Sequence, residues 1–192
     1  TETDKCKVMH IGKSNEHFSY YMDGVKLEKV SLVKDLGLWV SDDLKVSKQC
    51  TSAYSKGSQM LGMINRTIRC KTAKSLLPLY KTLVRPHLEY CTAAWSPYYQ
   101  KDRELLEKVQ RRFTRMIPGF GAKTYENRLR DLGLWSLEER RNRADLVEVY
   151  KMWKGLSRIS FDSFFEVDLQ HRTRGHSLKL RKNRCRLDIR QH

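Results

Sequence analysis

The feature that most constrains this fold is a change in the spacing of apolar residues near Ser47. Before Ser47, apolar and polar residues alternate in short runs, which is typical of strands; after it, apolar residues recur every three to four positions, which is typical of helices. Ser47 itself is a favourable N-cap. We therefore expect an α+β fold, mostly α, with a small antiparallel hairpin or sheet followed by a helical bundle. The first helical face comprises Cys50, Ala53, Gly57, Met60, Leu61, Ile64 and Ile68.

The strand signals lie within residues 1–43. Asp23 and Gly24 separate two apolar runs, and this dipeptide favours a type I′ hairpin turn because both central positions need a positive φ. Residues 36–40 predict a third strand.

Further helical spacing follows the first helix. Arg85 and Pro86 predict a bend or a new helix start. Thr124 and Gly133 predict the two ends of a short helix, and Ser136 with Glu139 predicts a capping box. The expected helices cover residues 73–95, with Leu76, Tyr80, Leu83 and Val84 inward, 101–117, 124–133 and a last segment running from Ser136 toward Gly155.

The chain carries a net charge of +16, with 38 Lys and Arg against 22 Asp and Glu. Residues 1–43 hold 6 basic and 8 acidic residues, whereas residues 44–158 hold 24 and 10. Such an excess favours a polyanionic partner, with nucleic acid ahead of a membrane surface. Glu104 and Glu107 would partly neutralise Lys108 and Arg111. The candidate phosphate contacts are Arg66, Arg69, Lys71, Lys74, Arg85, Lys108, Arg111, Arg112 and Arg115.

Several catalytic patterns are incomplete or absent in the sequence. Asp42 and Asp43 follow an apolar run, as polymerase metal ligands do, but a helix start follows them and a third carboxylate is missing, so a helix N-terminus is favoured. His87 and Cys91 suit a helix contact better than a metal. There is no nucleophile elbow and no phosphate loop. Zinc spacing is not met by His171, His176, Cys185 and His192.

The five cysteines are odd in number and widely spaced, which argues against a disulfide framework. No apolar run approaches the roughly 20 residues of a membrane span. We expect a nuclear or cytoplasmic protein in a reducing compartment, neither secreted nor bound to membrane. Because the chain opens at Thr1 and stops in a charged run, we expect a segment of a longer polyprotein.

Several short runs occur in an order and spacing that closely resembles LINE-type reverse transcriptases, the polymerases of non-LTR retrotransposons of the chicken-repeat and jockey-like kind. The longest is the run at residues 79–91, which is similar to part of the thumb of these enzymes. The runs that carry the resemblance are residues 5–12, 34–37, 79–91, 109–112, 132–138 and 174–176.

The resemblance implies a role for each part. Residues 1–43 would be a palm edge, 44–158 the thumb, and 159–192 a truncated connecting tail. Lys5 would lie near the phosphates of the incoming nucleotide, and Leu36 with Gly37 would form the primer grip. The metal-binding aspartates of the family would precede Thr1, so this segment is expected to hold an RNA–DNA hybrid or duplex without polymerising. It would need no cofactor itself, whereas the parent polymerase, with its upstream palm and fingers, would use Mg²⁺.

Two other readings stay open. The segment could be a non-enzymatic nucleic-acid-binding module derived from a retrotransposon, or a helical protein-interaction domain whose charge is incidental. Phosphate contacts predict affinity that falls steeply with salt, which the interaction domain does not.

Overall fold

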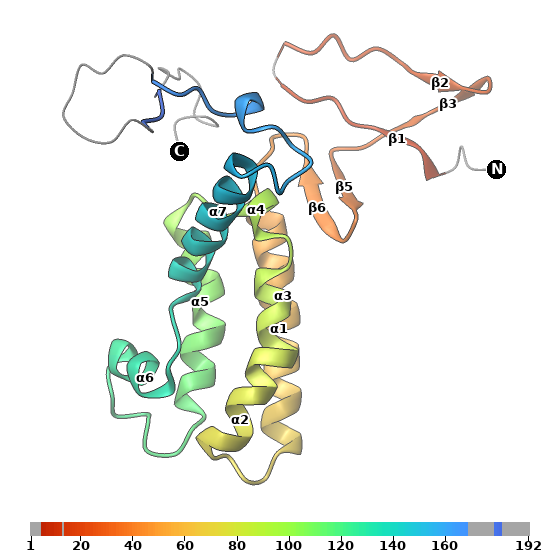
Figure 1. The fold of residues 1–192 in the computed structure, drawn as a ribbon. Coiled ribbons are helices and arrows are strands. Elements are labelled where there is room, and N and C mark those ends of the chain that lie inside the picture. Colours follow the sequence, from red (N-terminus) through yellow and green to blue (C-terminus); the bar gives the residue numbers. More distant parts are fainter. Residues whose placement is uncertain (1–4, 13, 169–178, 182–192) are drawn as a thin grey trace. The chain divides into compact units, whose positions relative to one another are not determined.

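The computed structural model describes residues 5–12, 14–168 and 179–181 of the chain (Figure 1). The fold is mostly helical, and the described residues also form three two-stranded sheets, two of them antiparallel, which confirms the expected α+β class. The chain divides into two compact units, Thr1–Glu138 and Glu139–His192. The three-part division drawn from the sequence stays a prediction.

The strands of the first unit pair two by two. β1 (Lys7–Val8) pairs in parallel with β4 (Glu28–Lys29), and β2 (Tyr21–Met22) pairs antiparallel with β3 (Val25–Lys26). Asp23 and Gly24 connect β2 to β3 with φ values of 51° and 75°, so the predicted hairpin turn is confirmed.

The third pair is a four-residue hairpin of β5 (Leu32–Asp35) and β6 (Leu38–Ser41). Leu36 and Gly37 form its turn, with φ values of 45° and 90°. The prediction of a strand over residues 36–40 was therefore wrong for its first two residues. A two-residue hairpin turn of type I′ needs positive φ at both positions, which Gly adopts freely and Leu rarely does.

Helix α1 (Ser47–Thr67) buries Cys50, Ala53, Gly57, Leu61 and Ile64, which confirms the predicted apolar face. Its N-cap is Val46 rather than Ser47. The Ser47 hydroxyl instead donates to Asp102 Oδ2 at 2.6 Å, which ties the start of α1 to α5.

Residues 73–95 form a broken helical segment. It consists of α2 (Ala73–Leu79), a π-helical turn η2 (Tyr80–Val84), α3 (Arg85–Glu89) and α4 (Thr92–Trp95). The predicted helix start at Arg85 is confirmed. The inward position predicted for Leu83 is wrong, since its side chain is 37% exposed. The wider π turn rotates the buried face relative to a regular α-helix.

The next two helices of this unit are α5 (Gln100–Arg115) and α6 (Tyr125–Leu132). Thr124 accepts from the Asn127 N–H at 3.3 Å, and Gly133 ends α6 with a φ of 59°, so both predicted caps are confirmed. Helix α7 (Leu137–Trp153) begins directly after Ser136, and a short η3 (Phe161–Ser163) follows in the second unit.

The core of the first unit lies where α1 packs against α5 and α3, and α5 against α6. Tyr80 of η2 stacks on Phe113 of α5 with ring centroids 4.1 Å apart. The buried Tyr80 hydroxyl donates to Gln110 Oε1 at 2.6 Å. Helix α5 is therefore held on both sides, and its remaining face carries basic residues into solvent.

Candidate nucleic-acid interface

A groove lies beside the β5–β6 turn, between that turn and helices α1 and α3. Its volume is about 290 Å³. We call it the turn groove; its lining residues are Leu36, Gly37, Gln49, Ser52, Ala53, Lys56, Pro86, His87 and Tyr90.

Hydrogen bonds from the helices hold the hairpin at the turn groove. The Tyr90 hydroxyl donates to the Leu36 carbonyl at 3.2 Å, and Gln49 Oε1 accepts from the Trp39 N–H at 3.1 Å. The Leu36 side chain is nonetheless 84% exposed. The predicted primer-grip pair, Leu36 and Gly37, thus lies at an exposed turn whose backbone is held by the hydrogen bond from Tyr90.

The walls of the turn groove carry groups that suit a nucleic-acid strand. Lys56 offers a solvent-exposed ammonium, His87 a half-buried imidazole, and Tyr90 an exposed ring and hydroxyl. Cations contact phosphates, and aromatic rings stack on bases or sugars.

Lys56 and Tyr90 were not among the contact residues predicted from the sequence. A signal for Lys56 was present, since Gln49, Ser52 and Lys56 follow one another at helical spacing beside the buried stripe of α1. The signal for Tyr90 is tertiary, because its partner Leu36 is 54 residues away in sequence.

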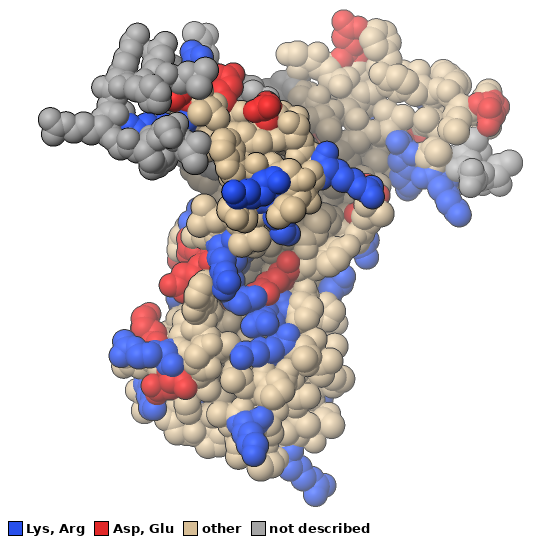
Figure 2. All heavy atoms as spheres, viewed as in Figure 1, with Lys and Arg blue, Asp and Glu red and all other residues tan. Residues whose placement is uncertain are grey.

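A first group of basic residues surrounds the α1–α2 connection. Arg66, Arg69 and Lys74 are exposed and Lys71 is half-buried. Within the described part of the chain none of the four forms an ion pair. Arg66 lies in the last turn of α1, where a cation also interacts favourably with the helix dipole. Figure 2 shows basic side chains at this end of the helical part.

A second group lies on α5, where Lys108, Arg111, Arg112 and Arg115 are all exposed. The predicted pairing of Lys108 with Glu104 and of Arg111 with Glu107 is wrong. Glu104 instead accepts from Gln100 at 3.0 Å.

The Glu107 carboxylate is buried, accepts from the Tyr125 hydroxyl, and accepts from the Leu137 N–H at 3.1 Å. A carboxylate taken into the core no longer neutralises a cation on the surface. Among the described residues, none of the four α5 cations has an ion-pair partner, so this helix presents more positive charge than its sequence suggested.

Two further predicted contacts differ from these groups. Arg85 was predicted as a phosphate contact, but its Nε lies 3.6 Å from Glu89 Oε2, so part of its charge is compensated. Lys5 is exposed just before β1 and does not line the turn groove.

The carboxylate of Asp43 is engaged in the turn that precedes α1. It accepts from the Ser41 hydroxyl at 2.6 Å and the Lys45 N–H at 3.0 Å, and it lies 3.0 Å from Lys45 Nζ. The Ser41 hydrogen bond, followed by those from Lys45, lowers the pKa of Asp43 to about 2. Asp42 and Asp43 precede the first turn of α1, so their predicted role at a helix N-terminus is wrong.

The structure also locates some of the His and Cys residues that were considered as metal ligands. His87 and Cys91, which were expected to make a helix contact, do not lie on one helix, because α3 ends at Glu89 and Cys91 has a left-handed backbone with φ 54°. No group of three or more possible metal ligands occurs in the part of the chain that the structure describes. Residues 171, 176, 185 and 192, the His and Cys residues whose spacing does not fit a zinc site, lie outside that part.

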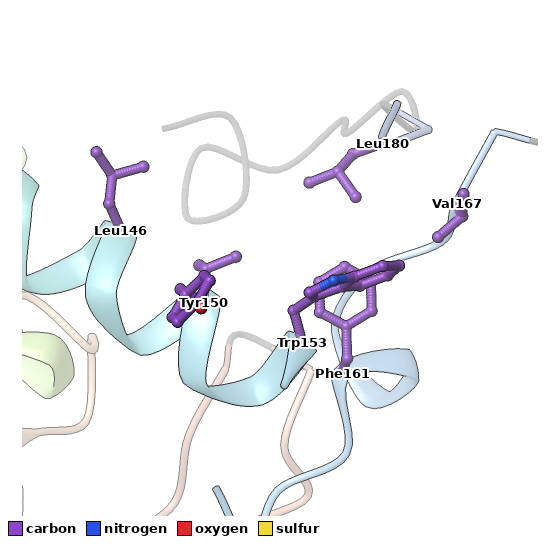
Figure 3. A pocket seen from close by; sticks show the side chains of 7 residues that line it. Leu146, Tyr150, Trp153, Phe161, Val167 and Leu180 are labelled. Carbon is purple, nitrogen blue, oxygen red and sulfur yellow. The ribbon is translucent and has the colours of Figure 1, made fainter. Parts of the chain in front are cut away.

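The second unit contains an apolar pocket of about 260 Å³ (Figure 3). Trp153 of α7 meets Phe161 edge to face, with ring centroids 5.0 Å apart. Val167 and Leu180 form an antiparallel bridge at its rim. Its lining has no cation, which sets it apart from the basic surface of the first unit; the lining residues are Leu146, Val149, Tyr150, Trp153, Phe161, Val167 and Leu180.

Within the described ranges no helix has the length and apolarity to cross a membrane. Comparison with known proteins gave no match to a family model, a curated protein or a solved structure.

Proposed function

We propose that this chain is the palm-edge and thumb segment of a LINE-type reverse transcriptase and that it holds an RNA–DNA hybrid through the phosphate backbone. The observation that carries the proposal is the unneutralised basic face of α5, formed by Lys108, Arg111, Arg112 and Arg115. The resemblance in the order of short sequence runs supports the enzyme family, and the basic surface supports the ligand class.

The two groups of cations suit backbone binding. Lys and Arg side chains that face solvent without an acid partner keep their full charge for phosphates, and each phosphate neutralised releases condensed counterions. Such contacts orient a duplex without reading its sequence. A hybrid also presents 2′-hydroxyls in a shallow minor groove, which hydroxyl and amide side chains can recognise.

The turn groove gives the proposal a second contact region. Leu36 and Gly37 lie at an exposed tip, with Lys56, His87 and Tyr90 beside them. The apolar Leu36 side chain, next to a cation and an aromatic ring, suits the end of a nucleic-acid strand, where a sugar and a terminal base are accessible.

Catalysis lies outside this proposal for the segment itself. Asp43, one of the two aspartates considered as metal ligands, accepts hydrogen bonds from the Ser41 hydroxyl and the Lys45 N–H. In the parent polymerase, Mg²⁺ held by aspartates of the upstream palm would supply the metal chemistry of nucleotidyl transfer.

The test is binding of the chain to an RNA–DNA hybrid across a salt series, with two charge-matched variants. Lys74→Gln with Arg112→Gln removes one cation from each basic group. Lys26→Gln with Lys34→Gln removes two exposed lysines from the strand region. We expect the first variant to lower the salt slope by about two, at about one per phosphate contact, and the second to leave it unchanged. Equal effects of the two variants would show that only net charge matters and would contradict the proposal.

A further inference from the structure

Arg128 of α6 is a buried guanidinium with little to compensate its charge. Its side chain is only 2% exposed. Nη1 donates to the Arg111 carbonyl at 3.3 Å, while the buried Nε has no hydrogen-bond partner within the described residues. Arg128 forms no ion pair there, and Glu126 is the acid that favours its charged form.

Two exposed arginines lie close to this buried one. Arg111 and Arg115 are one turn apart on α5, and Arg111 and Arg128 both lie over the ring of Tyr125, at 5.0 and 5.4 Å from its centroid. Burial, and then the charges of Arg115 and Arg111, lower the pKa of Arg128. The positive charges of Arg111 and Arg115 thus act on Arg128, and we call these three residues the arginine cluster.

The arrangement is held rigidly from the core. The Tyr125 hydroxyl donates to Glu107 and accepts from Gln110 Nε2 at 3.0 Å. Burial and the nearby Glu107 charge raise the pKa of Tyr125, so the hydroxyl keeps its proton as a donor. The ring that positions Arg111 and Arg128 is thus fixed in the folded chain.

Among the described residues no carboxylate forms an ion pair with any of these three arginines, which leaves a place for an anion. The face of the Tyr125 ring offsets part of the cost of burying Arg128, but an aromatic quadrupole is weaker than a full countercharge. The planar fork of a guanidinium matches the oxygens of a phosphate group.

We propose that Arg111, Arg115 and Arg128 form a binding site for one phosphate group of a nucleic-acid backbone. Arg111 and Arg115 contact the phosphate oxygens from the surface, and Arg128 adds positive charge from beneath. The assignment to a backbone phosphate rests on the proposed function, whereas the affinity for phosphate does not.

The first test uses inorganic phosphate as the probe and the thermal unfolding midpoint as the readout. Phosphate replaces chloride at constant ionic strength. An anion that binds only the folded state raises the midpoint. Arg111→Gln with Arg115→Gln is compared with Lys108→Gln with Arg112→Gln, which removes the same charge from the same helix. General stabilisation by phosphate acts on every variant, so the differences between variants report the site.

We expect the wild type and the Lys108/Arg112 variant to share a phosphate-dependent rise that the Arg111/Arg115 variant loses. The same rise in all three proteins would overturn the site, because it shows no dependence on the cluster. An equal rise with acetate in the wild type would also overturn it, because it shows a general anion effect and no preference for phosphate.

The second test identifies the source of the phosphate. At constant ionic strength, replacing chloride by phosphate should weaken hybrid binding by the wild type and the Lys108/Arg112 variant, but not by the Arg111/Arg115 variant. Stabilisation without competition would mean that the site takes free phosphate, and the backbone assignment would be wrong. Hybrid binding with no phosphate effect in either test would overturn this inference while leaving the proposed function standing.

Discussion

Removal of one buried hydroxyl tests how α5 is held in the core. Tyr80 is fully buried, stacks on Phe113, and donates its hydroxyl to Gln110 Oε1 at 2.6 Å. In Tyr80→Phe the ring and its stacking remain, so little apolar burial is lost. What changes is that Gln110 Oε1 loses its donor inside the core.

A buried acceptor left without a partner costs about 1–3 kcal/mol. We therefore expect Tyr80→Phe to lower the free energy of unfolding of the first unit by about that amount. Urea unfolding followed by tryptophan fluorescence measures it, with an unchanged m value as the sign that only stability has changed. Tyr21→Phe, which removes a hydroxyl from an exposed ring of β2, serves as the control. A Tyr80→Phe variant as stable as the Tyr21→Phe control would refute the reasoning.

Three other perturbations have defined outcomes. Gly62→Ala should stabilise α1 by about 1 kcal/mol, because the added Cβ contacts no other atom. Gly57→Ala should give no such gain, because its Cβ would lie 2.9 Å from the buried Leu88 side chain of α3. Urea unfolding of both variants measures the difference. Ser41→Ala should raise the pKa of Asp43 from about 2 toward 3.8, as read by NMR titration. A lowered carboxyl pKa stabilises the fold above pH 3.8 and loses this effect as the pH falls toward 2, so the variant should lose less stability on acidification; an unchanged titration would contradict the assignment. Leu36→Gly should relieve a residue held at φ 45° yet weaken hybrid binding, and a variant that binds as tightly as the wild type would remove the turn from the interface.

Much of the fold followed from local signals in the sequence. The change in period near Ser47, the turn at Asp23 and Gly24, and the caps at Thr124 and Gly133 are all decided by neighbours within a few residues. The features that the sequence did not predict depend on contacts between residues far apart in the chain. Ser47 bonds Asp102, 55 residues away, instead of capping its own helix. The π turn before Pro86 has no simple signature in apolar spacing, so the outward position of Leu83 could not be read.

The basic surface was only partly readable from sequence. Spacing alone paired Glu107 with Arg111, but the Glu107 side chain turns into the core toward Tyr125. Arg128 reads as an ordinary surface cation in the sequence, and only the packing of α6 on α5 buries it beside Arg111 and Arg115. Helical spacing shows which residues share a face, but it does not show which of them another helix will cover.

The most direct test of the central claim is the affinity of the chain for an RNA–DNA hybrid between low and moderate salt. If four of the eight cations in the two basic groups, Lys74 and Arg112 among them, contact phosphates, the logarithm of the association constant should fall with the logarithm of salt with a slope of about −3 to −4. A folded chain that binds with such a slope would support a backbone-gripping thumb. A folded chain that shows no salt-dependent binding would contradict it and would favour a helical protein-interaction domain.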